Sequence, residues 1–380
     1  MPRDDDRSIE PEPPDAAASA VLDAVRPDAE RRRGRGARSN RSSRYDAGKR
    51  EDYDDGWETI ASLDAFRTEV MEERAKSIIS TNDSPDLNFS QSINPYRGCE
   101  HGCIYCYARP THAYLGHSPG LDFETKLYAK VNAPELLEQE LARRNYVPQT
   151  IALGAVTDPY QPIERDRGIT RRILEVLDAA SHPVGIVTKS AGVVRDVDIL
   201  ARMAARGLVK VAISTTSLDR HLARSMEPRA ATPARRIEAI RRLSEAGVPV
   251  SVMVAPIVPA LNDSEIEKIL EAGYAAGARE AGFVVLRLPL ELKELFREWL
   301  ETDQPNRAAR VISVLRSMHG GRDYVSEFGI RQRGTGPYAA QIATRFRLAC
   351  KRLGLNERSL KLRTDLFTPP TPQGGQMRLL

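Results

Sequence analysis

From residue 91 onward, short apolar runs alternate with longer amphipathic segments, and this pattern constrains the fold more than any other feature. The apolar runs are dense in Val and Ile and too short for helices, so they predict strands at residues 92–97, 150–156, 184–188, 209–214, 249–254 and 282–288. The segments between them repeat apolar residues at helical spacing and predict helices at 133–144, 169–180, 194–205, 233–246 and 265–275. This alternation, about six β-α units, implies a parallel sheet with right-handed crossovers.

Two α/β architectures fit such a series. One is a doubly wound sheet, and the other is a partial (βα)6 barrel of the TIM type; periodicity does not choose between them. In both, ligands bind beyond the carboxyl ends of the strands. Residues at those ends are therefore the candidate functional residues.

The segments outside this core differ in composition. Residues 1–60 hold few apolar residues and predict a disordered charged arm, whose basic run at 31–44 is either a solvated tail or a nucleic-acid contact. Residues 61–90 are a lead-in segment in which we expect one short helix. The core then covers residues 91–290, and residues 291–380 form a basic helical extension of two or three helices.

Charge is distributed unevenly along the 380 residues. The net charge is +4, but residues 1–60 hold 12 Lys and Arg against 15 Asp and Glu, whereas residues 301–380 hold 14 against 6. The basic extension suits a polyanion or an acidic partner protein, although a solvated helical surface has the same composition.

Two absences in the sequence bear on location. No apolar run reaches the length of a membrane helix, and the first 15 residues lack the apolar centre of a signal peptide. We therefore expect a cytoplasmic protein without a membrane partner.

Three of the four cysteines lie within "NPYRGCEHGCIYCY" (94–107), at Cys99, Cys103 and Cys106, directly after the first predicted strand. Three thiolates on one short loop converge on a soft metal centre. Zinc is one candidate, with an imidazole as its fourth ligand from His101, His112 or His117. An iron–sulfur cluster is the other, and it would keep one iron without a protein ligand, the kind of open position at which metal enzymes do chemistry.

The spacing CxxxCxxC, its place after the first strand and the β-α units that follow resemble the radical S-adenosylmethionine (SAM) enzymes. The resemblance implies a [4Fe–4S] cluster on Cys99, Cys103 and Cys106, with SAM chelating the free iron. It also implies that the reduced cluster cleaves SAM to a 5′-deoxyadenosyl radical, which abstracts hydrogen from a substrate. A reductant such as flavodoxin or ferredoxin is the implied partner.

The same resemblance implies where SAM is bound, because the family places its contacts at successive strand ends. The implied contacts are Tyr105 and the apolar stretch with Pro256 and Val258 for the adenine, Thr157 and Asp158 for the amino group, Lys189 for the carboxylate, and Ser214 and Thr216 for the ribose hydroxyls.

Two stretches, "TDPYQPIE" (157–164) and "PIVPALND" (256–263), resemble the spore photoproduct lyase and DNA-repair-photolyase-like branch of this family. In that lyase a cysteine near the end of the second strand returns a hydrogen atom to the product. This chain has Ala155 at that place. Either Cys350 folds over the barrel mouth as the hydrogen donor, or SAM regenerates the radical, or the reaction differs.

The basic extension contains the loop "RGTG", flanked by Arg331, Arg333 and Tyr338, which suits contact with phosphate. Together with the basic charge, it favours a nucleic-acid substrate and a lyase-like reaction. The enzymatic alternative is a radical SAM enzyme that acts on a peptide or small metabolite, with the basic extension receiving the electron donor. The non-enzymatic alternative is a zinc-stabilised nucleic-acid-binding module.

Overall fold

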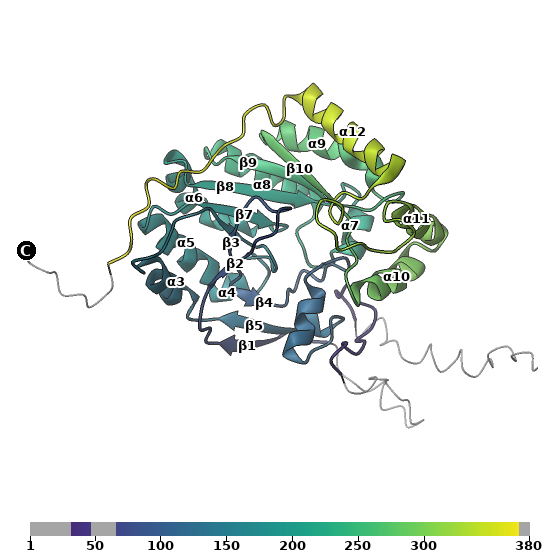
Figure 1. The fold of residues 1–380 in the computed structure, drawn as a ribbon, viewed down its shortest axis with the longest axis horizontal. Coiled ribbons are helices and arrows are strands. Elements are labelled where there is room, and N and C mark those ends of the chain that lie inside the picture. Colours follow the sequence, from purple (N-terminus) through teal and green to yellow (C-terminus); the bar gives the residue numbers. More distant parts are fainter. Residues whose placement is uncertain (1–31, 47–65, 372–380) are drawn as a thin grey trace, which may run out of the picture.

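The computed structural model describes residues 32–46 and 66–371, and its centre is a seven-stranded sheet (Figure 1). In spatial order β10-β9-β8-β7-β6-β3-β2, the strands are β10 (Glu280–Val285), β9 (Val250–Ile257), β8 (Val209–Thr215), β7 (Val184–Thr188), β6 (Ile151–Leu153), β3 (Gln91–Ile93) and β2 (Ile79–Thr81). Within this sheet, the strands β3, β6, β7, β8, β9 and β10 are parallel, and their spatial order follows the chain. Strand β2 pairs antiparallel with β3 at the edge. Because the order never reverses, the architecture is a partial (βα)6 barrel and not a doubly wound sheet.

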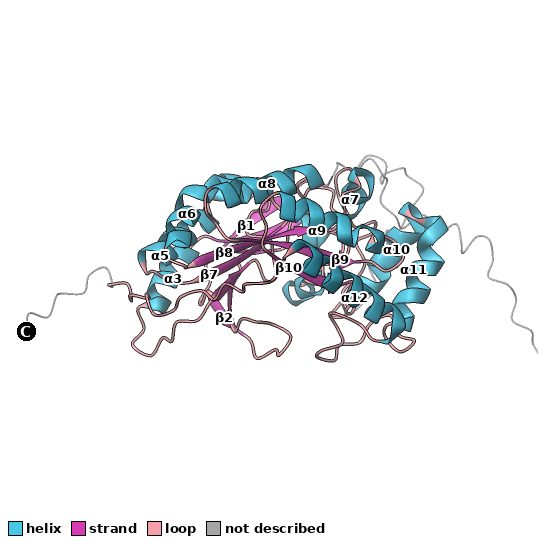
Figure 2. Ribbon diagram, turned by 90° about the horizontal axis from the view of Figure 1, so that it is seen from above, coloured by secondary structure: helices cyan, strands magenta, loops and turns pink. Residues whose placement is uncertain are grey.

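The helices between the strands cover the outer face of this sheet, as Figure 2 shows. They are α3 (Ala133–Leu141), α5 (Ile169–Ala179), α6 (Val197–Ala205), α8 (Pro233–Glu245) and α9 (Ile266–Ala275). Each buries one face; in α5 this face is Ile169, Ile173 and Leu177. A Cβ on Gly273 of α9 would lie 2.8 Å from the Val252 side chain, so glycine allows this helix to approach β9 closely.

The first predicted strand is broken in two. Its second half, β4 (Tyr96–Arg97), belongs to a separate three-stranded sheet with β1 (Glu69–Glu73) and β5 (Lys126–Lys130). Pro95 separates β3 from β4, and because proline has no N–H to donate it interrupts the ladder at this point.

The short helix expected in the lead-in segment is wrong for its described part, residues 66–90. That part forms β1 and β2 instead. The sequence EVMEE of β1 is rich in helix formers, but parallel pairing with β5 over all five residues overrides this local preference.

The charged arm is ordered where the structure describes it. Residues 1–31 and 47–60 lie outside the described residues, but residues 32–46, here called the N-terminal strap, pack against the core, and Ala37 is fully buried. The strap's basic side chains face acidic groups of the same chain: Arg44 pairs with Glu291 at 2.9 Å, and Arg41 with Glu294 at 3.3 Å. The prediction of disorder is therefore wrong for the strap, because these distant partners hold it.

The described part of the C-terminal extension, up to residue 371, contains three helices, at the upper end of the predicted two or three: α10 (Leu292–Asp303), α11 (Pro305–Ser317) and α12 (Gly336–Leu353). Helix α12 lies along α9, where Arg345 pairs with Glu267 at 2.6 Å. Part of the basic excess is thus neutralised inside the molecule. No helix in residues 32–46 and 66–371 has the length and apolar character needed to cross a membrane.

His182, directly before β7, makes stability depend on pH. It is fully buried, its Nε2 lies 2.7 Å from the Tyr146 hydroxyl, and burial lowers its pKa to about 4. Because this pKa lies below the unfolded value of about 6.5, protonation favours unfolding. Full stability is expected above pH ~6.5, and roughly 3 kcal/mol should be lost through this group as the pH falls toward 4.

Urea unfolding between pH 7 and pH 4 measures this effect. The His182→Gln variant should lose less stability over that range than the wild type does. The exposed His221, replaced in His221→Gln, is the control and should leave the pH dependence unchanged. An identical pH dependence in His182→Gln and wild type would show that His182 is not the titrating group.

Candidate metal centre and cofactor site

The three-cysteine loop follows β4 directly and brings its thiols together. Cys99 and Cys103 are each 7% exposed, and none of the three forms a disulfide. Burial raises the pKa of all three thiols, and at Cys99 the neighbouring thiols raise it further. Three thiolates therefore need a strong positive centre to remain ionised here, which a bound metal centre supplies.

The three histidines considered as a fourth zinc ligand are turned elsewhere. His101 Nδ1 lies 3.4 Å from the Asp158 carboxylate, His112 Nε2 contacts the Lys126 carbonyl at 2.9 Å, and His117 Nε2 contacts the Tyr128 hydroxyl at 2.7 Å.

The structure also lacks the ligand geometry of a single ion. Within residues 32–46 and 66–371, no group of three or more Cys, His, Asp or Glu side chains could hold one metal ion. A [4Fe–4S] cluster attaches each thiolate to a different iron, so its ligands stand farther apart than those of a single ion. An all-thiol donor set on one loop fits that cluster, whereas each of the three histidines that a Cys3His zinc site would need contacts another group.

A buried ion pair supports the backbone of the loop. Arg109, from the 3-10 helix η1 (Arg109–Leu115), donates to the carbonyls of Cys103 at 2.9 Å and Gly102 at 3.2 Å. Its guanidinium also pairs at 2.5 Å with Glu124 of α2 (Asp122–Thr125), and both side chains are fully buried. Glu124 in turn accepts the backbone N–H of Gly36, 2.8 Å away, so one carboxylate joins the strap to the loop.

The close approach of strap and loop requires glycine. A Cβ on Gly36 would lie 1.8 Å from the Gly102 carbonyl oxygen. Gly102 itself has φ +66°, which disfavours other residues. The N-terminal strap therefore packs directly against the cysteine loop. Sequence reasoning missed this contact because the two segments lie far apart in the chain.

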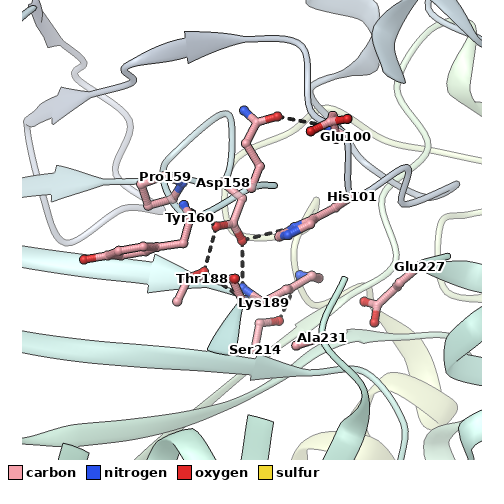
Figure 3. A network of polar contacts seen from close by, with 12 residues as sticks. Glu100, His101, Asp158, Pro159, Tyr160, Thr188, Lys189, Ser214, Glu227 and Ala231 are labelled. Atoms are coloured by element: carbon pink, nitrogen blue, oxygen red, sulfur yellow. Dashed lines mark hydrogen bonds and ion pairs between the residues drawn. The ribbon is translucent and has the colours of Figure 1, made fainter. Parts of the chain in front are cut away.

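Three of the predicted strand-end residues, Asp158, Lys189 and Ser214, form one polar network beside this loop (Figure 3). The Asp158 carboxylate accepts the Thr188 hydroxyl and the Lys189 N–H, both at 2.7 Å. Burial opposes ionisation of Asp158, but the charge of His101 and these hydrogen bonds outweigh it and lower the pKa to about 2. Lys189 Nζ then donates to Ser214 Oγ at 3.0 Å, so residues from β6, β7 and β8 meet.

Tyr105 and Thr216 meet at a buried glutamate that sequence reasoning missed. Their hydroxyl oxygens lie 3.1 Å apart, and both donate to Glu227, which directly follows α7 (Arg220–Met226). Arg236 of α8 pairs with Glu227, and both are buried. One feature of the sequence indicated a buried arginine here: Arg236 lies at helical spacing from Ile240 and Leu243, on the face of α8 that is buried.

Asn262, also missed, fixes the end of β9. Its Nδ2 donates to the carbonyls of Thr216 at 2.7 Å and Pro256 at 3.0 Å, and its Oδ1 accepts the Val258 N–H at 2.6 Å. The segment expected to contact adenine is therefore held rigidly against β8. On the other side of the site, the Thr157 hydroxyl donates to the Tyr96 carbonyl at 3.0 Å and anchors its own loop.

Cys350 lies away from this site. Its sulfur is 4.0 Å from Asn356 Nδ2, and the Asn356 side chain bonds both backbone groups of Ala281 at the start of β10. The cysteine loop lies at the opposite, carboxyl end of the strands. The structure therefore does not bring Cys350 to the barrel mouth, as a hydrogen donor would require.

The side chains that flank "RGTG" point to different partners. Arg331 Nε contacts Asp86 at 2.5 Å, and the Tyr338 hydroxyl donates to Asp263 at 2.6 Å. Arg333 is exposed and has no ion-pair partner within the described residues. These three residues do not converge on one ligand position.

Removing the Glu124 carboxylate tests the support of the loop. Glu124→Ala leaves the buried Arg109 unpaired and should lower the free energy of unfolding by about 3–5 kcal/mol. Reconstituted iron per chain should also fall, because the strap and the loop lose their shared acceptor. Urea unfolding and an iron assay measure both effects.

Glu294→Ala is the matched control, because Glu294 forms an exposed pair with Arg41. It should cost less than about 1 kcal/mol and leave iron content unchanged. Equal stability losses in the two variants would contradict the anchoring role of Glu124.

Comparison with known proteins agrees with this site. The family model described as "Radical SAM superfamily" matches residues 93–273, which include all three loop cysteines. An uncharacterised protein of Mycobacterium tuberculosis is 37% identical over 232 residues, covering 60% of this chain and 68% of the relative. An uncharacterised protein of Methanocaldococcus jannaschii is 29% identical over 199 residues, covering 52% of this chain and 71% of the relative.

Among solved structures, spore photoproduct lyase complexed with dinucleoside spore photoproduct matches with a TM-score of 0.55 at 18% identity, over 75% of this chain and 80% of that one. A mutant of that lyase with bound AdoMet and the same dinucleoside matches with a TM-score of 0.54 at the same identity and coverage. At this identity the likeness shows the partial-barrel fold. With the family match and the three-thiol loop, it leads to one conclusion: the chain belongs to the radical SAM superfamily, whose cofactors are a [4Fe–4S] cluster and SAM.

Proposed function

We propose that this radical SAM enzyme acts on nucleic acid in a lyase-like reaction related to DNA repair. The observation that carries the chemistry is the convergence of Asp158, Lys189 and Ser214 beside the three-thiol loop. When bound, the cluster and SAM supply a 5′-deoxyadenosyl radical that abstracts hydrogen from the substrate. The chain's own residues hold SAM in place and shield it from water.

Each strand end has a proposed role in holding SAM. Lys189, buried beside the loop, binds the carboxylate, and Asp158 binds the amino group, its acceptor atoms at present being taken by His101, Thr188 and Lys189 N–H. Ser214 and Thr216 lie at the ribose. The adenine lies against Tyr105 and against Pro256 and Val258, while Thr157 positions the loop that carries Asp158.

This chain differs from spore photoproduct lyase at the end of the second barrel strand. Ala155 supplies no thiol there, and Cys350 lies at the other end of the strands. A thiol-dependent hydrogen return is therefore not available from these two positions. We propose that 5′-deoxyadenosine would return the hydrogen atom to the product radical, which would allow SAM to be regenerated by reversal of its cleavage.

Two features support nucleic acid as the substrate class. The fold matches a lyase whose structure holds a dinucleoside photoproduct, and the extension carries a basic excess that includes Arg333, which has no ion-pair partner within residues 32–46 and 66–371. A peptide or small metabolite is the alternative substrate class, and it predicts no dependence on basic surface residues.

The same proposal needs an electron donor. A cavity of about 510 Å³ beside His101 is lined by Arg165, Arg195, Arg229 and Arg235 and by Glu164, so its lining is basic even though Arg195 pairs with Glu164 and Arg229 with Glu100. Because His101 lies between two cluster cysteines, this basic opening is the place at which we propose that an acidic flavodoxin or ferredoxin docks. Such a donor places the enzyme in the cytoplasm.

Deuterium transfer tests the substrate class. Anaerobic protein with SAM and a reductant should move deuterium from a deuterated oligonucleotide into 5′-deoxyadenosine or, where SAM is regenerated, into SAM, as measured by mass spectrometry of both compounds. If neither single strands nor duplexes transfer deuterium while SAM is still cleaved, the nucleic-acid proposal is wrong. Cys103→Ala should abolish SAM cleavage, whereas Cys350→Ala should retain it.

The role of Lys189 is tested separately. Lys189→Met keeps the length of the side chain but removes the ammonium, so SAM affinity should fall at least roughly ten-fold, as expected for a lost charge-assisted contact. Iron content should stay at the wild-type level, because no cysteine ligand changes. Unchanged SAM affinity by equilibrium dialysis would remove Lys189 from the proposed site.

A further inference from the structure

Arg287 and Tyr107 lie together at the barrel mouth, and no role above accounts for them. Arg287 follows β10 by two residues, and Tyr107 follows Cys106 directly. The Arg287 Cζ lies 4.6 Å from the centroid of the Tyr107 ring, and the Tyr107 hydroxyl donates to the Ala155 carbonyl beyond β6. The pair is therefore beside the cluster loop, at the carboxyl ends of the strands where substrate binds.

The guanidinium of Arg287 has no partner of its own. Within the described residues it makes no hydrogen bond or ion pair, and its Nε is buried without an acceptor. A guanidinium has five N–H donors, and a buried donor without an acceptor costs free energy. The guanidinium packs on the Tyr107 ring, and the two residues that flank Arg287 in the chain, Leu286 and Leu288, are buried. An anion from a ligand would satisfy these donors.

The acidic group that faces Arg287 is already engaged. Asp86, in the lead-in segment, accepts the Gly329 N–H at 2.6 Å and the Arg331 Nε at 2.5 Å. These contacts and, more weakly, the charge of Arg287 lower the pKa of Asp86, which places the carboxylate within electrostatic reach of both guanidiniums. Asp86 therefore forms its ion pair with Arg331, and Arg287 has no ion-pair partner within the described residues.

Arg331, the ion-pair partner of Asp86, forms a second arginine–aromatic stack. Arg331 Cζ is 4.5 Å from the ring centroid of Phe328, and the Phe328 ring is 53% exposed. Tyr107 is 44% exposed. The N–H of Val285, at the end of β10, donates to the Gln332 carbonyl at 2.8 Å, which ties the two stacks to one another.

We propose that Tyr107, Arg287 and Phe328, here called the mouth surface, bind an unpaired nucleotide of the substrate. This inference rests on the proposed function and names the part of the chain that recognises nucleic acid. Arg287 takes the phosphate, and the exposed rings stack with the base. Aromatic rings and arginine are the side chains that bind single-stranded or extruded bases, because a base in a duplex keeps its faces covered.

The chain contains a matched control at the other end of β10. Arg279 stacks on Tyr274 with Cζ 4.8 Å from the ring centroid, and Tyr274 is 36% exposed. Its guanidinium, however, donates to the carbonyls of Ala278 at 2.8 Å and Tyr274 at 3.2 Å. Arg279 therefore has the same ring contact but satisfied donors, at the end of the barrel away from the cysteine loop.

The experiment measures binding of a fluorescein-labelled single-stranded 12-mer to the full-length, cluster-loaded protein with SAM, by fluorescence anisotropy. Arg287→Ala should weaken binding roughly ten-fold, and Phe328→Ala should weaken it by a similar factor, as is typical of a lost stacking or phosphate contact. Arg287→Lys should recover part of the loss, because it keeps the charge without the planar stack. Arg279→Ala should bind as the wild type does.

The outcomes separate this inference from the proposed function. If the wild type binds no oligonucleotide, the nucleic-acid substrate class is wrong and the inference falls with it. If the wild type binds but Arg287→Ala and Arg279→Ala bind equally well, the mouth surface is wrong while the substrate class stands. If Arg287→Ala loses binding of an acidic peptide but not of the 12-mer, the anion is a carboxylate and the proposal is overturned. Circular dichroism and iron content of each variant show whether it is folded.

Discussion

The buried pair between Arg109 and Glu124 is the contact on which the arrangement of the site depends. Arg109 donates to two carbonyls of the cysteine loop, and Glu124 binds both that guanidinium and the backbone of the N-terminal strap. Two charges in a dry interior are costly unless every donor and acceptor is matched, and here the matching groups belong to three separate segments. The pair therefore converts a flexible loop of three thiols into a fixed binding site.

The position of the strap also changes the interpretation of its basic run. On composition, arginines in the first 60 residues suit a solvated tail or a contact with nucleic acid. In the structure, the strap spans from the cysteine loop to the start of α10, where Arg44 pairs with Glu291. Arg41 and Arg44 of the strap are thus paired with acidic groups of the same chain.

The sequence predicted best what depends on local pattern. The strand at 184–188 has the predicted bounds, because Val184 and Ile186 are buried in an apolar run between Pro183 and Lys189 that is too short for a helix. The three-cysteine loop was visible for the same reason, since its thiols lie within eight residues of sequence. The strap, the Glu227–Arg236 pair and Asn262 depend on contacts between distant segments, which no local pattern encodes. Pro95 was visible in the sequence, and its missing N–H is why the first strand divides.

The central claim is that the three-thiol loop holds a four-iron cluster with one iron left for SAM. Mössbauer spectroscopy of the anaerobic, iron-57-loaded protein, with and without SAM, tests it most directly. We expect a cubane cluster in which SAM changes the signal of one iron and leaves the other three unaltered. A protein that binds zinc in place of iron, or a cluster whose irons all remain equivalent when SAM is added, would contradict it.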